Sequence, residues 1–148
     1  MSKFVNLGDL VRRDRDLSRT AIIDLGGETK PAQYTHAELD AGANGVANAL
    51  LARGLQRGER VAILSANRAE YLMAYYGIMR AGLVAVPVNF KFPRRTIHFI
   101  LQDCGAKLVF CDSERLPDCP PDLQAVDFSN PDPGSGKDEV PGFRAFLG

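Results

Sequence analysis

Short apolar runs alternate with longer amphipathic segments between residues 61 and 111, and this alternation is the strongest constraint on the fold. Three runs are short and apolar, as buried strands are: Val61–Leu64, Leu83–Val88 and Lys107–Cys111. The segments after Asn67 and Pro93 carry apolar residues at helical spacing, and each stops at a glycine. Strands that alternate with helices predict a right-handed parallel arrangement. We therefore expect an α/β fold, a mostly parallel sheet flanked by helices.

The boundaries of these elements follow from individual residues. Asn67, with Glu70 three residues later, is expected to cap the first of the two helices. Leu83–Val88 is expected to be a fully buried strand that ends at Pro87, because proline cannot donate to a strand ladder.

Residues before position 60 predict three further elements. A short helix is expected at Asn6–Leu17, and Thr20–Leu25 and Ala32–Thr35 read as the strands of a hairpin around glycine-rich residues 26–30. A capping box of Thr35 and Glu38 predicts a helix directly afterwards, which ends before Gly54.

Two glycines lie inside that predicted helix. Gly42 and Gly45 each cost about 1 kcal/mol of helix stability relative to alanine. Such a cost indicates that another backbone packs close to them.

The residues after Asp112 are rich in Pro, Asp and Ser. We expect residues 113–148 to form a low-order, linker-like tail of one partial domain that spans 1–148. Within it, Leu123–Phe128 reads as a short strand, Asn130–Glu139 as a flexible loop and Val140–Leu147 as the start of a last helix.

Composition excludes several function classes. Lys plus Arg and Asp plus Glu both number 18 in the 148 residues, so no net field favours nucleic acid. No apolar run approaches the length of a membrane span, and no signal peptide precedes the first charges, so we expect a cytoplasmic protein. Three cysteines without C-x-x-C spacing indicate neither disulfides nor a zinc site.

Local motifs predict neither catalytic residues nor a metal site. Gly134–Lys137 resembles a phosphate loop, but Pro131 stands where its first glycine is required and Asp138 where a magnesium-binding hydroxyl is required. His36 and His98 are better explained as structural residues, since no partner stands at ligand spacing.

One loop suggests binding. Asn89–Arg95 follows a predicted strand and leads into a helix, the place where α/β sheets bind ligands. Its cations Lys91, Arg94 and Arg95 are suited to a phosphate group. Local sequence also allows that these cations are simply solvated.

Three motifs in order resemble a known family. They are Asn67-Arg-Ala-Glu-Tyr71, Gly77-Ile-Met-Arg-Ala-Gly82 and Val86-Pro-Val-Asn89, and Gly105-Ala-Lys107 and Tyr34-Thr-His-Ala-Glu-Leu39 agree. The set resembles the N-terminal subdomain of the adenylate-forming acyl- and aryl-CoA synthetases, the AMP-dependent synthetase/ligase family. The similarity covers residues 20–112 best.

The resemblance implies a ligase that activates a carboxylic acid with ATP and Mg²⁺ and then transfers the acyl group to coenzyme A. The family's Thr/Ser/Gly-rich phosphate loop does not occur in these 148 residues. We therefore expect a truncated fragment that binds no cofactor tightly, is inactive alone and self-associates through faces left uncovered.

The resemblance also implies a site. The basic residue two positions after the Val-Pro-x-Asn asparagine contacts the coenzyme A nucleotide in related ligases, which points to Lys91, with Phe90, Arg94 and Arg95 as further candidates. Lysine in place of arginine keeps the charge but loses the bidentate fork. An adenylation module that serves a carrier protein, a luciferase-type oxidation and a non-catalytic binding or assembly module remain alternatives. The acid itself is not identified.

Overall fold

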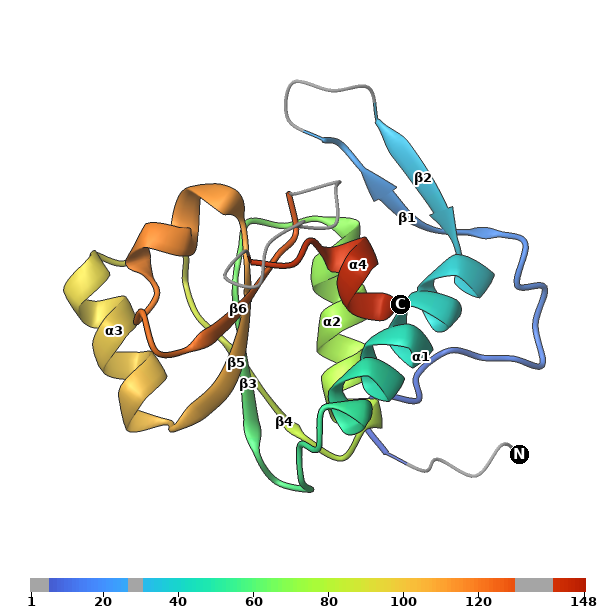
Figure 1. Cartoon of the computed structure of the whole chain (residues 1–148). Coiled ribbons are helices and arrows are strands. Elements are labelled where there is room, and N and C mark those ends of the chain that lie inside the picture. The colour runs from blue at the N-terminus through green and yellow to red at the C-terminus, as the bar shows by residue number, and fades with distance from the viewer. Residues whose placement is uncertain (1–5, 27–30, 130–139) are drawn as a thin grey trace.

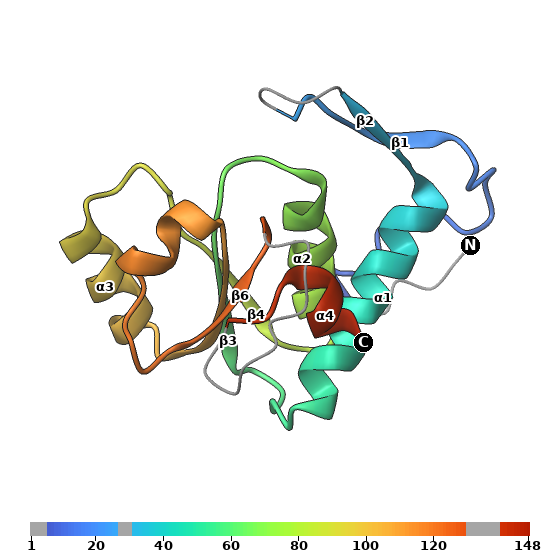
Figure 2. The same cartoon turned by 45° about the horizontal axis from the view of Figure 1, so that its top comes forward.

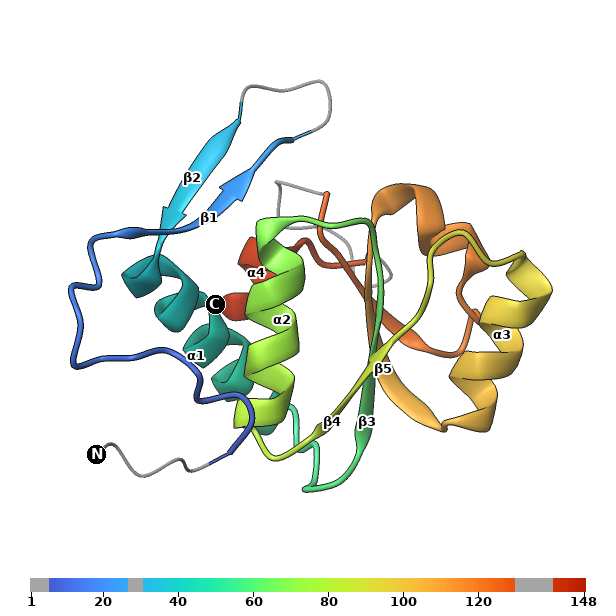
Figure 3. The same ribbon diagram turned by 180° about the vertical axis from the view of Figure 1, so that it is seen from behind.

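The computed structural model describes residues 6–26, 31–129 and 140–148. The body has a central sheet with α3 (Arg94–Asp103) on one face and α2 (Ala69–Arg80) with α4 (Phe143–Leu147) on the other (Figure 1). Helix α1 (His36–Ala52) lies outside α2. A hairpin of β1 (Thr20–Asp24) and β2 (Ala32–Thr35) projects from the body, as the view from behind also shows (Figure 3). Among the described residues, no helix is both long and apolar enough to cross a membrane.

The four-stranded sheet is entirely parallel. Its order is β4-β3-β5-β6, and the strands are β3 (Arg60–Leu64), β4 (Val84–Pro87), β5 (Ala106–Cys111) and β6 (Gln124–Asp127). Helix α2 connects β3 to β4, and α3 connects β4 to β5. The predicted α/β fold with a parallel sheet flanked by helices is therefore confirmed.

Strand β4 is less buried than its apolar sequence predicted. It lies at the edge of the sheet, paired only with β3, and Val84 is 46% exposed. Leu83 and Val88, which flank the strand, are buried. The prediction of a fully buried strand was wrong because strand order decides which strand lacks a second neighbour, although the strand does end at Pro87 as predicted.

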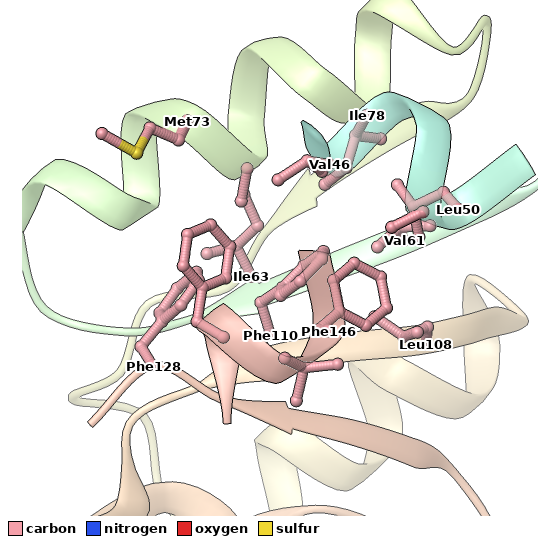
Figure 4. Close-up of a cluster of buried hydrophobic side chains, with 14 of the residues drawn as sticks. Val46, Leu50, Val61, Ile63, Met73, Ile78, Leu108, Phe110, Phe128 and Phe146 are labelled. Carbon is pink, nitrogen blue, oxygen red and sulfur yellow. The ribbon is translucent and has the colours of Figure 1, made fainter. Parts of the chain in front are cut away.

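Alternate side chains of the sheet enter two separate cores. Val61, Ile63 and Phe110 face α1 and α2, whereas Leu64 and Val109 face α3. This alternation follows from the two-residue period of a strand. The larger core is rich in phenylalanine: Phe110 stacks on Phe128 at 5.5 Å and meets Phe146 edge-on at 5.2 Å between ring centroids (Figure 4).

Helix α1 begins with the predicted capping box. The Glu38 N–H donates to Thr35 Oγ1 at 3.2 Å, and the Thr35 N–H donates to Glu38 Oε2 at 2.7 Å. The backbone approach expected at Gly42 and Gly45 was wrong in its location, since the nearest groups there are the side chains of Met73 and Leu147.

The close backbone contact lies on the facing helix instead. A Cβ atom placed on Gly77 of α2 lies 2.7 Å from the carbonyl oxygen of Ala43. Gly77 therefore lets α2 approach α1 more closely than any larger residue would allow.

Two predicted local elements differ in the structure. Residues 6–17 form turns, not a helix, because the Asn6 side chain accepts from the Gly8 N–H at 2.9 Å and Arg80 binds the Gly8 carbonyl. Asn67 does not cap α2, whose N-cap residue is Arg68, and the Arg68 side chain makes no capping hydrogen bond to the helix. The Ala69 N–H donates instead to Oδ2 of Asp24 on β1, at 2.9 Å.

The described part of the segment 113–148 contains the strand and the helix predicted there, as β6 and α4. It also contains a 3₁₀ helix at Ser113–Asp118 that was not predicted. Phe128, Phe143 and Phe146 are buried in the larger core. The expected low order is therefore wrong for these residues, because their aromatic side chains supply core contacts. The loop predicted at Asn130–Glu139 lies outside the described residues.

Candidate functional site

The loop Asn89–Arg95 begins at the carboxyl edge of the sheet. The Val88 N–H, directly after β4, donates to the Ile63 carbonyl of β3 at 2.8 Å. In Figure 2 this loop runs from the end of β4 over the sheet edge to α3. All four strands are parallel, so the loops after β3, β5 and β6 leave from the same edge. This edge is where ligands of open α/β sheets bind.

A tight turn orients the first residues of the loop. Asn89 accepts twice, from the Lys91 N–H through Oδ1 at 3.0 Å and from the Phe92 N–H through its carbonyl at 3.0 Å. Phe90 is half-buried against the core on the α3 side of the sheet. The turn leaves Lys91 exposed, with Nζ 5.9 Å from the centroid of the Phe90 ring.

Arg94 and Arg95 occupy the first turn of α3 and are exposed. Neither side chain makes an ion pair or hydrogen bond with another described residue, and the Lys91 side chain has, among these residues, only its contact with the Phe90 ring. Pro93, the N-cap residue of α3, provides no side-chain cap. The structure thus places the predicted residues Phe90, Lys91, Arg94 and Arg95 on one short segment that holds three unneutralised cations. Their role in binding coenzyme A stays a prediction.

A second polar group at the same edge, the Arg68 cluster, was missed from the sequence. It consists of Arg68, Glu70, Asp112 and Ser129. Arg68 donates to Glu70 Oε2 at 2.9 Å, to Asp112 Oδ1 at 3.1 Å and to Ser129 Oγ at 3.0 Å. Burial alone would lower the pKa of Arg68, but the carboxylates of Glu70 and Asp112 outweigh burial and raise it above its ordinary value.

The Arg68 cluster ties together the loops that follow three strands. Arg68 also donates to the Phe128 carbonyl at 3.0 Å, and Asp112 accepts from Ser65 Oγ and the Ala66 N–H, each at 2.8 Å. Because the donors and acceptors of the Arg68 cluster are hydrogen-bonded to one another, the cluster stabilises the arrangement of these loops at the sheet edge. The available sequence signal was Arg68 inside the Asn67–Tyr71 motif, which predicts helix capping and carries the family resemblance but specifies no partner for Arg68.

The part of the chain that the structure describes contains no group of three or more His, Cys, Asp and Glu residues arranged to hold a metal ion. Its cysteines are free thiols, of which Cys111 and Cys119 are buried. A hydrogen bond with Cys119, together with burial, raises the pKa of Cys111 well above its ordinary range. Such a thiol is protonated at neutral pH, so Cys111 is unsuited to act as a nucleophile.

Comparison with known proteins gives a consistent set of relatives. The family of AMP-binding enzymes matches residues 11–140. The long-chain-fatty-acid–CoA ligase FadD13 of Mycobacterium tuberculosis is 39% identical over 85 residues, 57% of this chain and 17% of the relative. The 3-hydroxybenzoate–CoA/4-hydroxybenzoate–CoA ligase of Thauera aromatica is 39% identical over 107 residues, 70% of this chain and 20% of the relative.

A solved structure agrees with these relatives. The anthranilate CoA ligase AuaEII in complex with anthranoyl-AMP superposes with a TM-score of 0.69 and 27% identity, over 78% of this chain and 23% of that one. The chain spans about a fifth of the length of the curated relatives it matches.

Proposed function

Because this chain belongs to the AMP-binding enzyme family, we propose that it is part of an ATP-dependent carboxylic acid–CoA ligase. The reaction joins a carboxylic acid to coenzyme A through an acyl-adenylate, and it releases AMP and pyrophosphate. The observation that carries the proposal is the match over residues 11–140, which includes the whole described sheet. The similarity to fatty-acid and hydroxybenzoate ligases supports an acid–thiol ligase and leaves the acid open.

Within that enzyme, residues 1–148 form a partial N-terminal domain. ATP and Mg²⁺ are bound outside it, because the sequence has no Thr/Ser/Gly-rich phosphate loop. This chain contributes the carboxyl edge of the sheet, which the Arg68 cluster stabilises, and the loop Asn89–Arg95 beside it, called the cationic loop.

The cationic loop binds the phosphates of coenzyme A. Lys91 is the principal contact, with Phe90, Arg94 and Arg95 around it. Support comes from the exposure of these cations, from the lack of any ion-pair partner for them among the described residues, and from the position at the sheet edge. A cation without a partner keeps its full charge for a phosphate group.

The test uses the enzyme of family length that contains this chain. Lys91→Ala is expected to raise the KM for coenzyme A about tenfold, the order expected for one lost charge-assisted bond. Acid-dependent exchange between ATP and pyrophosphate is expected to stay unchanged, because that half-reaction precedes coenzyme A binding.

Two further variants complete the test. Lys91→Arg keeps the charge and should retain most of the affinity. Lys107→Ala removes an exposed lysine near the amino end of β5 and should have no effect. Loss of pyrophosphate exchange in Lys91→Ala would show a structural role and contradict the assignment. Adenylate formation without transfer to coenzyme A would indicate a carrier protein as the acceptor.

The described surface also supports self-association. Ile23 and Leu25 on the hairpin are 61% and 71% exposed, and they border an apolar groove with Tyr71 and Leu72 of α2. Exposed apolar groups of this kind favour contact with a second copy.

A further inference from the structure

Two of the three cysteines meet at the carboxyl edge of the sheet. Cys111 is the last residue of β5, and Cys119 directly follows the 3₁₀ helix Ser113–Asp118. Cys111 is fully buried and Cys119 is 7% exposed, and both belong to the smaller core on the α3 side of the sheet. The 3₁₀ helix returns the chain to the end of β5 and so brings the second thiol to the first.

Hydrogen bonds fix the orientation of this pair. The Cys119 thiol donates to the Arg115 carbonyl at 3.5 Å, and the Cys111 thiol is hydrogen-bonded to Cys119. Because the hydrogen of Cys119 is directed at Arg115, Cys111 is the donor in the bond between the two sulfur atoms. The two sulfur atoms are therefore adjacent, with no side chain between them.

The two thiols differ in their ease of ionisation. The hydrogen bond from Cys111 lowers the pKa of Cys119 below its ordinary value, although burial works in the opposite direction. The same bond and burial raise the pKa of Cys111. Since the thiolate is the form that attacks an oxidant, Cys119 is the nucleophile of the pair and Cys111 is its neighbouring thiol.

Two other roles for the pair fit less well. Buried cysteines often act as small apolar side chains, and that role explains their burial but not the direct contact of one thiol with the other. A metal ion would need further ligands, and the described residues form no group of three or more His, Cys, Asp and Glu side chains.

We propose that Cys111 and Cys119 are a redox-active pair that a peroxide converts into an intramolecular disulfide. In the first step the Cys119 thiolate attacks one oxygen of hydrogen peroxide and the O–O bond breaks. Cys119 becomes a sulfenic acid, and the other oxygen leaves as hydroxide, which takes up a proton to give water.

In the second step the sulfur of Cys111 attacks the sulfenic sulfur of Cys119. The S–S bond forms, the S–O bond breaks, and the hydroxyl group leaves with the Cys111 proton as water. The two thiols lose two electrons in total, and one peroxide is reduced to two molecules of water. The sulfur atoms move only from hydrogen-bond contact to the bonding distance of about 2 Å.

The disulfide would join the end of β5 to the end of the 3₁₀ helix. Asp112, which lies in the loop closed by this bond, belongs to the Arg68 cluster and accepts from Ser65 Oγ and from Arg68. Oxidation would therefore restrain one of the loops at the carboxyl edge. The inference is independent of the proposed function, because the reaction needs no acid, ATP or coenzyme A.

The experiment treats the folded 148-residue chain with hydrogen peroxide, alkylates the remaining thiols after denaturation and maps the tryptic peptides by mass spectrometry. Cleavage after Lys107 and Arg115 places Cys104, Cys111 and Cys119 on three separate peptides. The peptides of Cys111 and Cys119 should be joined, with a mass about 2 Da below their sum, and dithiothreitol should release them.

Serine variants identify the role of each thiol. Cys119→Ser should abolish the disulfide and leave Cys111 alkylated, because the attacking sulfur is missing. Cys111→Ser should leave Cys119 as a sulfenic acid that dimedone labels, because no second thiol resolves it. Cys104→Ser is the matched control: Cys104 lies at the end of α3, where it donates to the Leu101 carbonyl at 3.5 Å, and its loss should not change the joined peptides.

The peptide map of the unmodified chain is decisive without any variant. If Cys111 and Cys119 are both alkylated after peroxide treatment, they are only core residues and the inference is wrong. Linkage of either one to Cys104 would also overturn it, because the contact in the fold would then not direct the oxidation. Either result leaves the test of Lys91 in the coenzyme A reaction unaffected.

Discussion

Gly77→Ala probes the closest approach between α1 and α2. A Cβ atom at position 77 would lie 2.5 Å from Val46 Cβ and 2.7 Å from the Ala43 carbonyl oxygen. Both distances are far inside van der Waals contact, and the carbonyl belongs to the backbone of α1, so it cannot move without the helix. The substitution therefore forces the two helices apart.

The magnitude follows from two opposing effects. Alanine inside a helix is favoured over glycine by about 1 kcal/mol. Overpacking of a core costs about 1–3 kcal/mol and more where backbone must move. We expect Gly77→Ala to lower the free energy of unfolding by about 2 kcal/mol, equivalent to a fall in Tm of about 4–8 °C for a chain of this size.

Gly45→Ala is the matched control on the facing helix. The nearest atom to a Cβ there is Cδ2 of Leu147 at 3.3 Å, the end of a side chain that can rotate away. The preference of alanine over glycine inside a helix should then dominate, so the free energy of unfolding should stay the same or rise by up to about 1 kcal/mol. Urea denaturation followed by far-UV circular dichroism measures both variants. If Gly77→Ala is as stable as Gly45→Ala, the inferred backbone contact is wrong.

Two further predictions concern acid stability and assembly. Burial works to raise the pKa of Asp40, but pairing with Arg13 and Arg80 outweighs burial and lowers it below 3.8. A lowered carboxyl pKa contributes stability above the unfolded value and loses it as pH falls through the folded value. Between about pH 5 and about pH 2, the melting temperature of Asp40→Asn should therefore fall less than that of the unmodified chain. Equal falls in melting temperature would show that Asp40 does not contribute to the acid sensitivity of the fold. In sedimentation velocity the chain should self-associate at micromolar concentration, and the double variant Ile23→Ser, Leu25→Ser should shift it toward monomer; a chain that is monomeric throughout would refute the proposed contact.

Much of the candidate site could be predicted from local patterns. The Asn89–Arg95 loop was located from a strand that ends at Pro87 and a helix that follows Pro93, and the structure has both boundaries there. The Arg68 cluster could not be located in this way. Arg68 and Asp112 are 44 residues apart, and nothing in either neighbourhood specifies the other as its partner.

The sequence by itself determined the type and order of most elements of this protein. The spacing of apolar residues in strands and helices, the Thr35–Glu38 capping box and the glycines at which helices end are all local properties. Only the tertiary structure decided that β4 lies at the sheet edge, that Asp24 of the hairpin caps α2, and that Phe99 faces solvent on α3. Each of these depends on which distant segments pair. Strand pairing and long-range hydrogen bonds are settled by the packing of the whole chain, and no short window of residues contains that information.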